Sequence, residues 1–108
     1  MDKKLPIEGL IPLLNTLVNS KNARFKVLLA HLNSKAVKLI CEFSYNLIKG
    51  IITISEIDWA RARSYRSLYK ILASPRKSLK TKLNCLIDHP TFTKTFFRLI
   101  IKTFDDGT

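Results

Sequence analysis

Apolar residues recur at intervals of three and four positions along most of this chain, as in Leu10, Leu14, Leu17 and Val18. This spacing places them on one face of an α-helix. Six helical segments are predicted in this way, and polar residues, Gly50 or prolines separate them. Their approximate ranges are 12–18, 21–32, 34–49, 56–72, 75–87 and 91–104.

Capping residues define several of the predicted helix ends. Asn33 precedes the third segment as an N-cap, and Gly50 follows it at the position where helices often end with glycine. Ser55, with an acid three residues later, begins the fourth segment. Pro75 stands in the first turn expected for the fifth. The stretch 51–54 (IITI) resembles a strand, but it is short and we interpret it as an extended connector.

The pattern predicts an all-α, compact single domain of about five to six short helices. At 108 residues the chain has the length of one domain, with 1–104 as the helical domain and 105–108 as a frayed tail. Because the helices are short, packing must stabilise them more than helix propensity does. The predicted core centres on residues with an apolar partner on the same helix face: Leu28, Ile40, Leu47, Leu68, Leu72, Leu83 and Phe96.

The charge balance is unusual, with 19 Lys and Arg against 8 Asp and Glu and a formal net charge of +11. Such a balance predicts attraction to polyanions, either nucleic acid or an anionic membrane surface. Much of the excess lies in the stretch from Trp59 to Ile87, which contains no acid. The phosphate-binding residues predicted there are Arg61, Arg63, Arg66, Lys70, Arg76, Lys77, Lys80 and Lys82, with Arg61 and Lys82 at the margins.

Helical spacing places Trp59, Arg63, Arg66 and Lys70 on one face of the fourth segment. An arginine can hold a phosphate at two points, and an exposed aromatic ring can stack on an unpaired base. The opposing interpretation is a merely solvated cationic face. The absence of any acid over 29 positions favours polyanion binding.

Two tyrosines, Tyr65 and Tyr69, alternate with these cations. Either ring could stack on a base, but the helical spacing to Leu68 and Leu72 favours a place in the core.

Catalytic and metal-binding chemistry is not indicated. Cys41 and Cys85 are isolated residues in apolar helical patterns, as expected for buried free thiols. With His31 and His89 as the only histidines, a tetrahedral metal site would need ligands from four separate segments. No Gly-rich phosphate loop or nucleophile motif is present. The sequence therefore predicts a protein that is not an enzyme and has no metal or cofactor.

The last segment offers an alternative function. Phe92, Phe96 and Leu99 share one face, with Lys94, Arg98 and Lys102 on another. This pattern is typical of a helix at a membrane surface or a protein interface, and equally of one that closes a small core. We favour the core interpretation. No apolar run approaches the ~20 residues of a membrane span, and an intracellular location without secretion is expected.

The middle of the chain also carries a series of features found together in one family. Residues 42–50 (EFSYNLIKG) supply an acid before an Asn, then two apolar residues and a Gly, namely Glu42, Asn46, Leu47, Ile48, Lys49 and Gly50. Ile54-Ser55, the cationic segment 61–72 and the basic stretch 78–82 (SLKTK) follow. Over 25–100 the chain resembles small basic proteins encoded by Maverick/Polinton transposons and adintoviruses, adenovirus-related elements of animals. It departs from them at 88–90 (DHP), where they have a glycine-rich segment.

That resemblance implies a viral or transposon-encoded protein associated with packaged DNA in a nucleus or virion, and it supplies no catalytic residues. Together with the charge pattern, it leads to the hypothesis of non-specific nucleic-acid binding through phosphates, with DNA favoured over RNA. The alternative is a protein–protein or membrane-surface adaptor that uses the last helix. An acidic protein partner and a homo-oligomer are also left open.

Overall fold

The computed structural model describes residues 6–105, which form seven α-helices, one 3-10 helix and no strand. The all-α prediction is thus confirmed for this part of the chain, and the stretch 51–54 is a connector. The elements are η1 (Pro6–Leu10), α1 (Ile11–Val18), α2 (Asn22–Ala30), α3 (Ser34–Ile48), α4 (Glu56–Arg63), α5 (Arg66–Ala73), α6 (Leu79–Asp88) and α7 (Pro90–Asp105).

The predicted number of helices is wrong because the fourth segment is two helices, α4 and α5. The amides of Ser64 and Tyr65 bond to carbonyl oxygens three residues back, which tightens the last turn of α4. The Ser64 hydroxyl also donates to the Arg61 carbonyl oxygen at 2.7 Å. The core-facing spacing of Ala62, Tyr65 and Tyr69 continues across this break, which is why the sequence pattern predicts a single helix.

The fifth predicted helix begins later than expected. Its N-cap is Ser78, whose Oγ accepts from the Thr81 amide at 3.1 Å. Ser74 instead stabilises a turn, because its Oγ accepts from the Arg76 amide at 3.2 Å. At the other end, Asp105 belongs to α7 and not to a tail. Residues 1–5 and 106–108 lie outside the described part of the chain.

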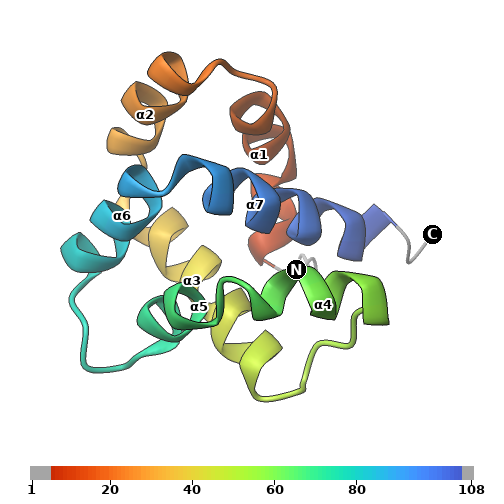
Figure 1. Ribbon diagram of the computed structural model, residues 1–108. Helices are drawn as coiled ribbons and strands as arrows, with labels where there is room; N and C mark the ends of the chain where they lie inside the picture. Colours follow the sequence, from red (N-terminus) through yellow and green to blue (C-terminus); the bar gives the residue numbers. More distant parts are fainter. Residues whose placement is uncertain (1–5, 106–108) are drawn as a thin grey trace, which may run out of the picture.

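Helix α7 crosses the middle of the molecule, with α1 and α2 on one side and α4 and α5 on the other (Figure 1). Its apolar face is buried, and Phe92, Phe96 and Phe97 are each at most 1% exposed. The interpretation of this helix as one that closes the core is therefore confirmed. Its Lys94 also faces inward, donating to the Ser20 carbonyl oxygen at 2.6 Å and lying over the Phe25 ring.

The predicted core is only partly correct. Four of its members are buried, namely Ile40, Leu47, Leu72 and Phe96. The other three, Leu28, Leu68 and Leu83, are half-buried at the edge of the core. The difference arises because the phenylalanine rings of α7 fill the centre, and periodicity within each helix does not show which position on its apolar face points toward them.

Candidate nucleic-acid interface

The site begins where α3 ends. The amide of Gly50, which has a φ of 78°, donates to the Leu47 carbonyl oxygen, and the Ile51 amide donates to that of Asn46. This is a Schellman motif, which needs a residue with positive φ and therefore favours the predicted glycine. The chain then returns through residues 51–55 to α4. The predicted N-cap of α4 is confirmed, because the Ser55 Oγ accepts from the Asp58 amide at 3.1 Å.

Helix α5 is held on α3 by a buried hydrogen bond. The Ser44 hydroxyl, which is fully buried, donates to the Tyr69 carbonyl oxygen at 2.9 Å. The two helices pack closely against each other, with Leu47 and Leu72 buried. This contact sets the rotation of α5 and leaves Arg66 and Lys70 exposed.

A depression of about 330 Å³ lies between α3, α4 and α5, and we call it the Trp59 depression. Its cationic residues are Arg63 of α4 with Arg66 and Lys70 of α5, all exposed. Trp59 and the three cations that were predicted to share one helix face thus line one depression. The single helix that was expected to contain them is two helices, α4 and α5. The complete lining is Leu47, Ile48, Trp59, Ala62, Arg63, Arg66, Tyr69 and Lys70.

The predicted core position of the two tyrosines is correct for Tyr69, whereas Tyr65 packs against the core at its edge. Tyr69 is 3% exposed, and its ring centroid lies 5.0 Å from that of Phe92 and 5.2 Å from that of Phe96. Tyr65 is half-buried, with its ring 5.2 Å from Phe92. Burial raises the pKa of the Tyr69 phenol, which keeps it neutral. Of the three aromatic residues in the cationic stretch, Trp59, half-buried in the lining of the depression, is the one left for stacking.

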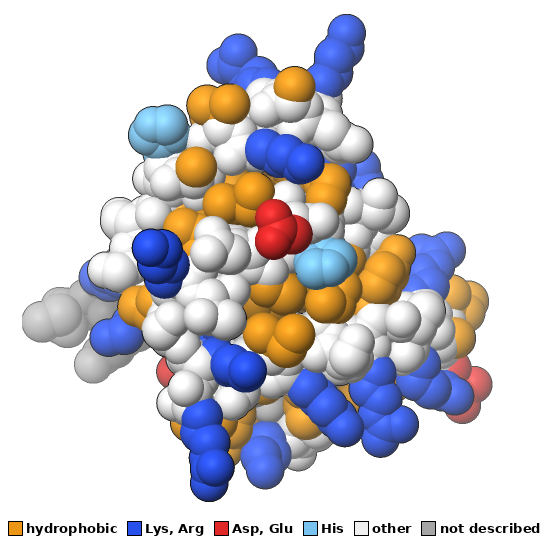
Figure 2. Space-filling view, turned by 60° about the vertical axis from the view of Figure 1, so that its left-hand side comes forward, with side chains coloured by type: hydrophobic (Ala, Val, Ile, Leu, Met, Phe, Trp, Pro, Cys, Tyr) orange, Lys and Arg blue, Asp and Glu red, His pale blue; other side chains and the backbone are white. Residues whose placement is uncertain are grey.

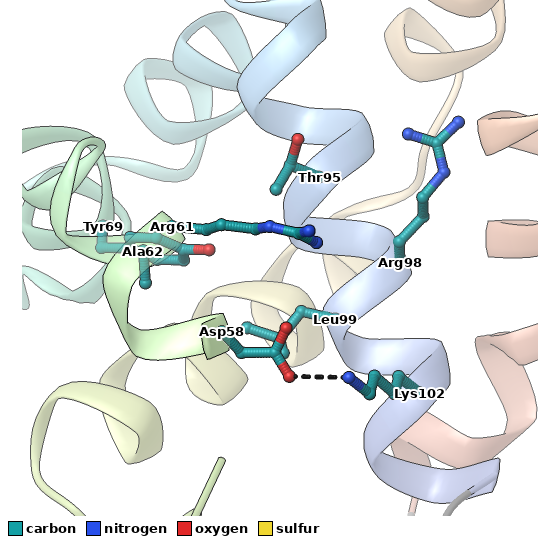
Figure 3. A pocket seen from close by; sticks show the side chains of 8 residues that line it. All are labelled: Asp58, Arg61, Ala62, Tyr69, Thr95, Arg98, Leu99 and Lys102. Atoms are coloured by element: carbon teal, nitrogen blue, oxygen red, sulfur yellow. Dashed lines mark hydrogen bonds and ion pairs between the residues drawn. The ribbon is translucent and has the colours of Figure 1, made fainter. Parts of the chain in front are cut away.

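Arg61 does not join Arg63. It lines a separate groove of about 310 Å³ between α4 and α7, where its side chain extends toward α7 (Figure 3). Positions two residues apart on a helix are separated by roughly 200°, so this divergence could have been predicted from the sequence. Arg98, which also lines this groove, extends away from Arg61 along α7 (Figure 3).

An ion pair closes one end of that groove. Lys102 Nζ lies 3.0 Å from Asp58 Oδ2 (Figure 3). The hydrogen bond from Lys102 is the main cause that lowers the pKa of Asp58, with help from the Ser55 hydroxyl. Lys102 is thereby engaged within the protein, and the groove has a mixed charge.

The remaining predicted cations lie beyond α5. Arg76 and Lys77 are exposed in the connection to α6, and Lys80 is exposed in the first turn of α6. Lys82 is half-buried near Cys41. Burial raises the pKa of the Cys41 thiol to about 11, and the Lys82 ammonium opposes this in part. In the face of the molecule that Figure 2 shows, Lys and Arg side chains gather along the lower margin, and few acidic side chains are visible.

The eight predicted cations therefore do not form one contiguous cluster. Three gather at the Trp59 depression, Arg61 lies in the α4–α7 groove, and the others follow in the connection to α6 and on α6 itself. Leu47 and the exposed Ile48 were not predicted from the sequence as neighbours of the cations. Helical spacing places Ile48 on the apolar face of α3, but the structure leaves it 40% exposed. No local signal indicates this contact, which depends on how α5 packs on α3.

The histidines and cysteines lie outside the Trp59 depression and have contacts or burial within the fold. His31 and His89 each have Nδ1 within 2.9 Å of a carbonyl oxygen four residues back, at the ends of α2 and α6. Cys41 and Cys85 are buried free thiols. Within residues 6–105, no group of three His, Cys, Asp or Glu side chains could hold a metal ion. In the same range, no helix has the length and apolar character needed to cross a membrane.

Comparison with known proteins identifies no relative: no family model, curated protein or solved structure matches the chain.

Proposed function

We propose that this protein binds nucleic acid without sequence preference, through phosphate contacts from α4, α5 and the start of α6. The observation that carries the proposal is the gathering of Arg63, Arg66 and Lys70 around one depression whose lining contains no acid. Three exposed cations held close together repel one another, which favours binding of a counter-charge at that place. A backbone of regularly spaced phosphates supplies several such charges at once.

The acids closest in sequence do not neutralise these cations. Asp58 faces α7 and pairs with Lys102. Glu56 is exposed in the first turn of α4, where an acid stabilises a helix through the positive end of its dipole. Neither residue lines the Trp59 depression.

The start of α6 extends the positive surface. Its first turn contains Lys80 and no acid, and Arg76 and Lys77 precede it in an exposed connection. Cations at a helix N-terminus are electrostatically unfavourable for folding, because the helix dipole is positive there. An anion bound at this end would offset that repulsion, which fits a role in binding phosphates better than one in stability.

Phosphate contacts carry no sequence information, so binding is expected to be non-specific. DNA is the favoured partner, since the resemblance to transposon- and virus-encoded basic proteins would make the ligand a packaged genome. The adaptor alternative has less support, because the apolar face of α7 that it needs is buried in the core.

The test is equilibrium binding by fluorescence anisotropy to labelled duplex DNA, to a second duplex of scrambled sequence, to RNA, to anionic vesicles and to polyglutamate. We expect equal affinity for the two duplexes and a fall of about 10²–10³-fold between roughly 50 and 200 mM salt. Tighter binding to vesicles or polyglutamate than to either nucleic acid would overturn the proposal.

Two matched triple variants locate the site. The α4–α5 triple, Arg63→Ala, Arg66→Ala and Lys70→Ala, removes the cations of the Trp59 depression. The α2–α3 triple, Arg24→Ala, Lys26→Ala and Lys38→Ala, removes the same charge from exposed positions on α2 and α3. Helix α2 lies at the opposite end of the molecule from α4 and α5 (Figure 1). Only the α4–α5 triple should bind much more weakly, and equal losses would indicate an effect of net charge alone.

A further inference from the structure

The Trp59 depression has features that phosphate binding alone does not require. Part of its lining is apolar, namely Leu47, Ile48 and Ala62, and Ile48 is 40% exposed. Trp59 lines it as a half-buried aromatic side chain. A duplex exposes its phosphates, but the faces of its bases are stacked on one another and are not accessible to a protein. An apolar, aromatic-lined hollow beside the cations would therefore stay empty in a complex with duplex.

An unpaired nucleotide has the complementary arrangement. It presents a flat apolar face that can stack on an aromatic ring, and it has a phosphate on either side. The depression of about 330 Å³ lies at the lower end of the roughly 300–1,000 Å³ of small-molecule sites. It is thus large enough to admit one base. The cations on α4 and α5 would meet the phosphates that flank this base.

We propose that the Trp59 depression binds one unpaired base of single-stranded nucleic acid, with the flanking phosphates held by Arg63, Arg66 and Lys70. This inference rests on the proposed function, since it assumes that these cations meet phosphates. It adds a preference for single strands over duplex and assigns Trp59 a role in stacking. Because any base has a flat face, the preference is for single-strandedness and not for sequence.

The experiment uses Trp59 as its own reporter, because it is the only tryptophan in the sequence. Three ligands of about 12 nucleotides are compared at the same salt: oligo-dT, an abasic oligomer with the same phosphates, and a duplex. We expect oligo-dT to quench Trp59 fluorescence and the other two to leave it nearly unchanged. In anisotropy, oligo-dT should bind about 5–150-fold more tightly than the abasic oligomer.

Two variants separate stacking from folding. Trp59→Leu keeps an apolar side chain against the core but removes the stacking surface, and Trp59→Phe restores an aromatic ring. With helicity checked by circular dichroism, Trp59→Leu should lose the preference for oligo-dT over the abasic oligomer while keeping affinity for the latter. Trp59→Phe should regain most of that preference.

The outcomes distinguish this inference from the proposed function. Equal binding of all three ligands without quenching would overturn the single-strand site and leave phosphate binding intact. Quenching by the duplex or the abasic oligomer as strong as by oligo-dT would also overturn it, because no unpaired base is then involved. If none of the three ligands binds, the single-strand site and the proposed function both fail.

Discussion

Leu72→Ala is expected to destabilise the protein much more than Leu68→Ala, although both leucines belong to α5. The Leu72 side chain is fully buried, whereas Leu68 is half-buried at the edge of the core. Truncation of a buried leucine removes its transfer free energy and leaves a cavity, at a cost of about 2–5 kcal/mol. We expect a loss of about 3 kcal/mol for Leu72→Ala and about 1 kcal/mol for Leu68→Ala.

The comparison tests the rotation of α5, on which the site depends. Lys70 is two positions from Leu72 and so lies roughly 200° around the helix from it. If Leu72 points into the core, Lys70 must point outward. The free energy of unfolding would be measured by urea denaturation followed by far-ultraviolet circular dichroism. At about 4–8 °C for each kcal/mol, Leu72→Ala should also lower the Tm by about 12–24 °C. Equal losses, or a larger one for Leu68→Ala, would refute this rotation and the position of Arg66 and Lys70 with it.

Three further predictions concern side chains around the core and the groove. Because burial raises the pKa of Cys41 to about 11, its thiolate fraction at pH 8 is roughly 10⁻³. Cys85 is also buried, so Ellman's reagent should label both cysteines only after unfolding. Rapid labelling of the native protein would contradict this prediction. Asp58→Asn should reduce stability at pH 7 by less than about 1 kcal/mol. The pKa of Asp58 is lowered in the folded protein, so the ionised carboxylate stabilises the fold above its ordinary pKa of 3.8. This stabilisation disappears as pH falls through the lowered pKa, and the variant and the parent should therefore become equally stable in acid. A difference in stability that persists in acid would show that the substitution acts in another way. Ser44→Ala should cost about 1 kcal/mol, and an unchanged urea midpoint would mean that the bond to the Tyr69 carbonyl oxygen contributes nothing.

The helices and their caps were largely predictable because they depend on local sequence. Asn33 accepts from the Ala36 amide, and Gly50 ends α3, as residues of those types do in many helices. The start of α6 was misplaced because Ser74-Pro75 and Ser78 both resemble N-caps, and only Ser78 has a following turn packed on the core. Where two local signals for a helix start lie this close together, tertiary contacts determine which of them becomes the N-cap.

The site was predictable only in part for the same reason. Helical spacing correctly grouped Trp59 with Arg63, Arg66 and Lys70, because the break at Ser64 preserves the phase of the buried face. The apolar part of the lining was not predictable, since Ile48 lies at the end of the preceding helix, α3, and joins the cations only through the packing of α5 on α3.

The most direct test of phosphate binding by α4 and α5 is the slope of log K against log salt for duplex DNA. Each duplex phosphate contact contributes about −0.9, so four to six contacts give a slope of about −4 to −5. The α4–α5 triple should remain folded and lose nearly three units of slope, equally for different DNA sequences. The α2–α3 triple should change the slope by less than about one unit. A larger change in the α2–α3 triple than in the α4–α5 triple would show that Arg63, Arg66 and Lys70 form only a solvated surface.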